Sequence, residues 1–216
     1  MSTIKIQWQL IKSYLLPILY YMLIASIMTI QSSSIIFSAL LAATLMAMKL
    51  TSLPFEVDTN ENLDKFYGSL PVSTNDLISS RYGLMIIIGL IGIILSVFLR
   101  LILVLIIKKT ISSPSEIIIA IILGMVFYVI LISIQLPLYY RYGTIKVRLF
   151  SIIPVIFYVL GVSLYIYTDI LNNLMKIIGY FKNNIWVSII LILIVTLLVG
   201  YISFAISKNV VKQKEQ

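Results

Sequence analysis

The stretch from Tyr82 to Ile107 reads YGLMIIIGLIGIILSVFLRLILVLII and contains one charged residue, Arg100. A helix that crosses a bilayer needs about 20 predominantly apolar residues, so this stretch is long enough to span it. Five other runs have the same character: Ser13–Ile30, Ser33–Leu50, Ile117–Tyr139, Leu149–Ile170 and Ile185–Ser207. The sequence therefore predicts an all-α, polytopic membrane protein with six transmembrane helices.

The composition of the whole chain supports a bilayer as its solvent. Of the 216 residues, 61% are hydrophobic and 11% are charged, whereas soluble domains carry about 25% charged residues. The chain contains no cysteine and no histidine, so it has no thiolate chemistry and lacks the commonest metal ligand. We therefore expect no metal site and no cofactor bound by this chain.

The basic residues predict the orientation in the membrane, because cytoplasmic segments carry an excess of lysine and arginine. With the N-terminus inside, the inner segments hold the larger basic set, namely Lys5, Lys12, Lys49, Lys65, Arg81, Arg141, Lys146, Arg148, Lys208, Lys212 and Lys214. The outer segments hold only Lys108, Lys109, Lys176 and Lys182. Both termini are therefore expected in the cytoplasm. The net charge of +8 then points to anionic membrane lipids as partners and not to nucleic acid.

The chain divides into three parts on this interpretation. Residues 1–12 mix apolar and polar residues around Trp8 and predict an interfacial helix at headgroup depth. A solvated extension of the first span is the alternative. Residues 13–207 form the six-helix transmembrane domain, with a polar cytoplasmic loop at 51–81, and residues 208–216 form a cytoplasmic tail.

The polar loop predicts two short cytoplasmic helices between the second and third spans. Asp58 or Thr59 can cap the first, Asn60–Tyr67, because their side-chain oxygens accept backbone N–H groups. The second, Ser73–Ser80, starts with a serine three residues before Asp76, the spacing of a capping box, and is expected to continue into the third span. The apolar side chains of the first helix can pack back on the membrane domain or dock in a groove of a partner.

The sequence KFYGSLPVSTNDLISSRY at residues 65–82 favours the partner. It resembles the segment after the second span of bacterial ABC-2 type transporter permeases. The match is dense at Phe66, Ser69, Leu70, Pro71, Val72, Ser73, Ile78, Ser80, Arg81 and Tyr82. Six spans, inner termini and a short N-terminal surface helix are also similar to that family. One position departs, because a basic residue often follows the motif serine and this chain has Thr74.

The resemblance implies a transport subunit that is not itself an enzyme. In that family two permeases, identical or paralogous, form the pathway, and two copies of a separate ABC ATPase subunit bind ATP and Mg²⁺ below them. This chain has no glycine-rich loop before a Lys-Ser or Lys-Thr pair, so the nucleotide site belongs to the partner. The residues expected to couple to the ATPase are Leu63, Asp64, Lys65, Phe66, Tyr67, Leu70, Pro71, Asp76 and Arg81.

Arg100 interrupts the third span, where a charged side chain is costly. Counted along the helix from Tyr82, it lies near the outer interface, so it can reach the headgroups by snorkelling. Alternatively it forms an intramembrane ion pair with Asp169, near the outer end of the fifth span, or with Glu116.

Two further patterns concern packing and the membrane surface. Small residues recur every four positions, which lets helices approach closely within one chain or between subunits; they are Ala39, Ala43 and Ala47, and Ala120 and Gly124. Tyr139, Tyr140 and Tyr142 stand beside basic residues at the inner end of the fourth span. They predict an aromatic belt among the headgroups.

These observations favour the permease of an ABC exporter in the bacterial plasma membrane, with the direction implied by the resemblance. The largely aliphatic spans suit an amphipathic or hydrophobic cargo, such as a peptide, toxin, antimicrobial or lipid-like compound. A non-transporting membrane anchor or sensor subunit is the first alternative, in which the polar loop binds a regulatory protein. An intramembrane enzyme is disfavoured, because the spans offer no histidine, cysteine or carboxylate pair.

Overall fold

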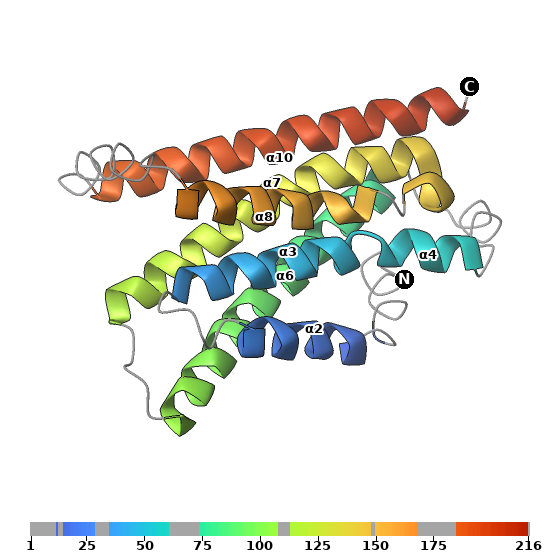
Figure 1. Cartoon of the computed structure of the whole chain (residues 1–216). Coiled ribbons are helices and arrows are strands. Elements are labelled where there is room, and N and C mark those ends of the chain that lie inside the picture. The colour runs from blue at the N-terminus through green and yellow to red at the C-terminus, as the bar shows by residue number, and fades with distance from the viewer. Residues whose placement is uncertain are drawn as a thin grey trace.

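The computed structural model describes residues 12, 15–28, 35–60, 74–107, 113–147, 150–167 and 185–215. They form α2 (Leu15–Met28), α3 (Ile35–Leu50), α4 (Leu53–Asn60), α6 (Thr74–Ile106), α7 (Pro114–Val147), the 3₁₀ helix η1 (Phe150–Ile152), α8 (Ile153–Tyr167) and α10 (Ile185–Glu215). No strand occurs in these ranges. Figure 1 shows most of the helices running roughly alongside one another, with α6 crossing the others obliquely.

The all-α prediction is confirmed for the described part of the chain, and each predicted apolar run contains a helix. Within the described residues, four helices are long and apolar enough to cross a membrane, at Ile35–Glu56, Asn75–Ile106, Pro114–Gly143 and Ile192–Gln213. The apolar stretches of α2 and α8 are shorter, at Leu19–Met28 and Ile153–Ser163. The number of six spans and the inner position of the termini therefore stay predictions.

The two terminal segments are described to different extents. Apart from Lys12, the interfacial helix predicted at residues 1–12 lies outside the described residues. The segment 208–216, predicted as a cytoplasmic tail, continues α10 as helix through Glu215. The last basic residues of the chain are therefore carried on an extension of the final helix.

α3 lies at the centre of the bundle and packs against α2, α6, α7 and α8. Its small residues Ala39, Ala43 and Ala47 are fully buried. Gly124 of α7 faces them, because a Cβ atom built at Gly124 would lie 3.1 Å from the Cβ of Ala39. The predicted close packing is confirmed, and it joins α3 to α7 within one chain.

α6 approaches α7 closely where Gly89 faces the ring of Tyr128. A Cβ atom at Gly89 would lie 2.2 Å from Cζ of that ring. Tyr128 is fully buried, and its hydroxyl donates a 2.8 Å hydrogen bond to the carbonyl oxygen of Met85, one helical turn earlier on α6. The absent side chain at Gly89 therefore makes room for the ring against the α6 backbone.

The outward faces of the long helices are apolar. Large hydrophobic side chains are exposed on α6 at Ile87, Ile91, Leu95, Phe98, Ile102 and Leu105, and on α10 at Leu193, Ile194, Leu197, Leu198, Tyr201 and Ile202. On α6 they recur every three or four residues, which places them on one face of the helix. A soluble monomer does not expose so much contiguous apolar surface, so these faces fit contact with lipid.

Candidate functional site

The residues predicted to couple to an ATPase fall into two groups. The first group lies within 61–73, outside the described residues, and consists of Leu63, Asp64, Lys65, Phe66, Tyr67, Leu70 and Pro71. The second group is Asp76 and Arg81, both on α6. The structure thus describes the helices on either side of segment 61–73, with α4 before it and α6 after it.

The helix before this segment was not predicted: α4 begins at Leu53 and ends at Asn60. Asp58 and Thr59, predicted to cap a helix at Asn60–Tyr67, lie in the last turn of α4, and the rest of that predicted helix lies outside the described residues. The backbone N–H groups of Phe55 and Glu56 donate to the carbonyl oxygen of Ser52, at 3.1 and 2.9 Å. An N-cap carbonyl accepts the first helical bond, and a proline in the first turn needs no N–H partner. The sequence Ser52-Leu-Pro54 was therefore the signal for the true start.

The continuity between the loop and the third span is confirmed. α6 runs as one helix from Thr74 to Ile106. Asp76 is exposed in its first turn, where a negative charge interacts favourably with the helix dipole. The hydroxyl of Ser79 donates a 3.1 Å hydrogen bond to the carbonyl oxygen of Asp76. The loop end of α6 and the predicted third span are thus parts of one helix.

Arg81 lies in a buried aromatic cluster made of Phe55, Arg81, Tyr139 and Tyr140, called here the Arg81 cluster. Cζ of Arg81 is 5.1 Å from the ring centroid of Phe55 and 6.0 Å from that of Tyr140. Phe55 stacks on Tyr139 with centroids 5.1 Å apart and meets Tyr140 edge-on at 5.0 Å. Only 3% of the Arg81 surface is exposed. Residues from α4, α6 and α7 therefore meet at one point.

The contacts of the Arg81 cluster are expected to stabilise the packing of α4, α6 and α7. A cation above an aromatic ring gains about 2 kcal/mol or more when it is shielded from water. Each aromatic pair adds about 0.5–1.5 kcal/mol beyond the area it buries. The planar guanidinium suits this position better than a lysine ammonium, because it can stack on rings and is more weakly hydrated.

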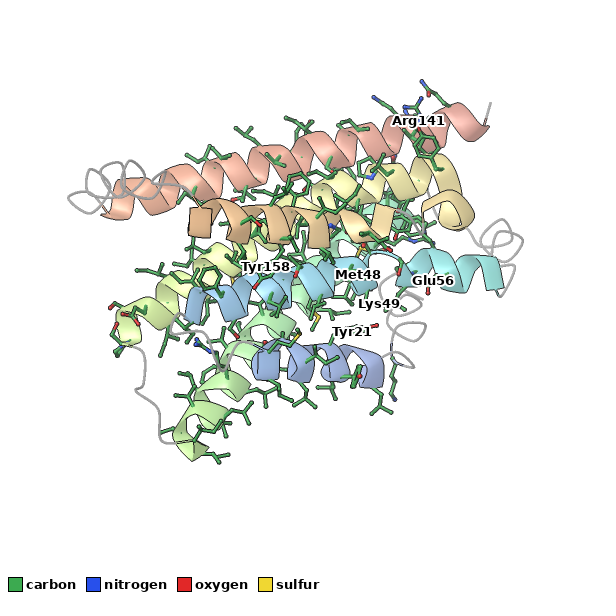
Figure 2. All side chains as sticks on the ribbon, in the orientation of Figure 1. Tyr21, Met48, Lys49, Glu56, Arg141 and Tyr158 are labelled. Atoms are coloured by element: carbon green, nitrogen blue, oxygen red, sulfur yellow. The ribbon has the colours of Figure 1, made fainter. Side chains whose placement is uncertain are left out.

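Sequence reasoning missed most of this cluster. The interpretation of Tyr139 and Tyr140 as members of a headgroup belt is wrong, because they are 2% and 8% exposed and pack on Phe55. Tyr142 is exposed as a belt residue should be, and Cζ of Arg141 lies 5.5 Å from its ring centroid. Figure 2 shows Arg141 projecting outward at this end of the bundle. Nothing in the sequence pattern separated the buried tyrosines from the exposed one.

Tyr82, the residue after Arg81, joins α6 to α10. Its hydroxyl lies 2.7 Å from Oγ of Ser203 and 2.8 Å from Oγ of Ser207. All three residues are buried. Two adjacent residues of the motif that resembles ABC-2 permeases thus hold α6 to three other helices, Arg81 to α4 and α7 and Tyr82 to α10.

Replacing Tyr82 with phenylalanine is expected to lower the free energy of unfolding by about 1 kcal/mol, because hydrogen bonds between membrane helices contribute about 0.6–1.7 kcal/mol. Unfolding of the purified protein in a denaturing detergent measures the change. Tyr201→Phe is the matched control, since Tyr201 is 71% exposed on the outward face of α10. Equal stability of the two variants would contradict the assignment.

A proline interrupts α7 close to both contacts. Pro137 lies inside the helix and has no N–H to donate to the carbonyl oxygen four residues earlier, at Ser133. That oxygen accepts a 2.7 Å hydrogen bond from Oγ of Ser203 instead. Two residues before the proline, Oε1 of Gln135 accepts a 2.9 Å hydrogen bond from Oγ1 of Thr51. Neighbouring helices therefore satisfy the polar groups around the proline.

Arg100, the charged residue of the third span, is turned into the bundle. It is 3% exposed, which differs from the exposed position expected of an arginine that snorkels to the headgroups. One turn earlier, Oγ of Ser96 lies 3.3 Å from Oγ of Ser26 on α2. Asp169 lies outside the described residues, and Glu116 is exposed in the first turn of α7. The Arg100–Asp169 ion pair therefore stays a prediction.

Comparison with known proteins identifies the family. The profile described as an ABC-2 family transporter protein matches residues 2–212, nearly the whole chain. No curated protein and no solved structure matched. The family match confirms the resemblance found at residues 65–82 and, together with the long apolar helices, makes this a membrane protein. The chain belongs to the ABC-2 family of transporter proteins, whose members are the membrane subunits of ABC transporters.

Proposed function

We propose that this chain is the permease subunit of an ABC exporter in a bacterial plasma membrane. It pairs with a second permease, identical or paralogous, and with two copies of an ABC ATPase that binds ATP and Mg²⁺. The observation that carries the proposal is the family match over residues 2–212. The anchoring of both ends of segment 61–73 to the bundle, through α4 and α6, supports it.

The proposed ATPase contact is segment 61–73, with Leu63 and Phe66 as its apolar anchors. Exposed leucine and phenylalanine side chains on a short helix are typical anchors for a hydrophobic groove. Asp64, Lys65 and Tyr67 are their neighbours in the sequence, and Leu70 and Pro71 precede α6. Asp76 is exposed in the first turn of α6, where it can take part in the same contact.

The proposed cargo is amphipathic or hydrophobic. The predicted spans are largely aliphatic, and aliphatic side chains give no coordination for a small ion. A peptide or a lipid-like compound can keep its apolar part against such side chains. If both termini are cytoplasmic, as the basic residues predict, segment 61–73 lies on the side of the ATP supply; the direction of export is what the resemblance implies.

The decisive experiment is purification of the chain co-expressed with cassette ATPases encoded near its gene. A Leu63→Ala, Phe66→Ala double variant is expected to bind the ATPase more than about 30-fold more weakly, because loss of even one of the two interface anchors costs about 2 kcal/mol. ATP turnover in the complex should fall with it. The matched control is Phe157→Ala on α8, since Phe157 is an exposed phenylalanine far from the loop in sequence.

Two outcomes would overturn the proposal. One is a wild-type chain with which no ATPase co-purifies. The other is a double variant that binds and activates the ATPase as the Phe157→Ala control does. A stable complex that hydrolyses ATP but moves neither a fluorescent amphipathic peptide nor a fluorescent phospholipid across a vesicle membrane would favour the anchor or sensor subunit.

A further inference from the structure

Two contacts from α6 reach α7 on opposite sides of Pro137. After the proline, Arg81 lies against Tyr140 and against Phe55, which itself stacks on Tyr139. Before the proline, the connection is indirect and runs through α10. The Tyr82 hydroxyl contacts Oγ of Ser203, and Ser203 donates to the Ser133 carbonyl oxygen that Pro137 leaves without its helical donor.

The two contacts start from consecutive residues of one helix. With 3.6 residues per turn, Arg81 and Tyr82 point about 100° apart around the axis of α6. A rotation or tilt of α6 therefore displaces them in different directions. Such a movement bends α7 at the place where its backbone ladder is already interrupted, since sharp kinks occur where proline removes a helical bond.

We propose that Pro137 is a hinge in α7 and that Arg81 positions the turns that follow it. The inference rests on the proposed function, in which ATPase closure moves segment 61–73 and with it α6. The Arg81 cluster passes the movement to the last turns of α7, while Ser203 holds the part before Pro137 to α10. The hinge converts a movement at the cytoplasmic loop into a change of shape of the membrane domain.

The chain suits a direct measurement of this movement, because it has no cysteine and introduced cysteines can be labelled specifically. One pair of spin labels, at Tyr142 and Lys212, reports the distance from the last turns of α7 to the end of α10. A reference pair, at Ile134 and Ile206, reports the part of α7 before Pro137. All four side chains are exposed, and labelled copies are diluted with unlabelled chain so that most complexes carry one labelled copy.

The expected result concerns the complex with its ATPase, without nucleotide and with a non-hydrolysable ATP analogue. The 142–212 distance should shift with nucleotide, and the 134–206 distance should not. Arg81→Gln should abolish the shift while the ATPase still binds. Lys49→Gln is the matched control and should retain it, because Lys49 makes a cation–π contact of 5.9 Å with Tyr21, on a different helix pair. Pro137→Ala, which restores the backbone donor, should also abolish the shift.

The inference is overturned if the shift persists in Arg81→Gln or in Pro137→Ala. It is also overturned if both label pairs shift equally, since the parts of α7 on the two sides of Pro137 would then move together. A failure of the proposed function would give a different result, because the wild-type chain would then bind no ATPase. That result would remove the basis of this inference as well. A purely structural role of Arg81 would lower thermal stability without selectively removing the nucleotide-dependent shift.

Discussion

Replacement of Gly89 with valine is expected to lower the free energy of unfolding by about 3 kcal/mol, the upper end of the range for overpacking a close-packed interior. A Cβ atom at this position lies 2.2 Å from the Tyr128 ring. The ring cannot turn away, because Tyr128 is fully buried and its hydroxyl is hydrogen-bonded to Met85. The substitution must therefore separate α6 from α7 or expel the ring.

The measurement is unfolding in a denaturing detergent, together with the yield of folded protein in the membrane. Gly83→Val is the matched control on the same helix, since a Cβ atom at Gly83 meets nothing within 4 Å. Adding Tyr128→Leu to the Gly89 variant should recover part of the loss, because leucine leaves room beside the backbone. If Gly89→Val and Gly83→Val are equally stable, the close approach described here is wrong.

The second large effect is expected at Gly124, where α7 crosses α3. A Cβ atom there would lie 3.1 Å from Cβ of Ala39 and 3.2 Å from its carbonyl oxygen. A backbone atom cannot move out of the way as a side chain can, so Gly124→Leu must push the two helices apart. We expect a loss of about 2–3 kcal/mol in the free energy of unfolding, whereas Gly124→Ala should cost less.

Two further variants make this test specific. Gly161→Leu on α8 is the control, because nothing lies within 4 Å of a Cβ atom there. The double variant Ala39→Gly, Gly124→Ala moves one methyl group from α3 to α7 and should be more stable than Gly124→Ala alone. Additive effects of the two single changes would show that the residues do not share one contact, since coupling between neighbours is what a double-mutant cycle detects.

The helices could be predicted from the sequence, because long apolar runs and small-residue spacing are local patterns. The runs around α3, α6, α7 and α10, and the packing at Ala39 and Gly124, followed from them. The Arg81 cluster could not be predicted, because it joins residues of three helices that no local pattern connects. Tyr82 and Ser203 likewise bond across 121 positions of sequence. The exposed Tyr142 and the buried Tyr139 and Tyr140 could not be distinguished in the sequence for the same reason.

α4 was not predicted, for a different reason. Ser52, Asp58 and Thr59 are all residues that favour helix caps, and no local pattern shows which of them precedes a helix. In the structure the helix begins at Leu53, and Phe55 in its first turn packs against Tyr139. The contact of segment 61–73 with an ATPase stays a prediction, since it lies outside the described residues.

The hydrogen bond from Ser203 to the Ser133 carbonyl oxygen also bears on how the protein is made. α7 leaves the ribosome well before α10, the last helix in the described chain. Until α10 is in place, that oxygen lacks both the proline donor and the Ser203 donor, and within a bilayer no water can replace them. The final helix therefore completes the backbone hydrogen bonding of an earlier one. A chain truncated before α10 is expected to be degraded by quality-control proteases.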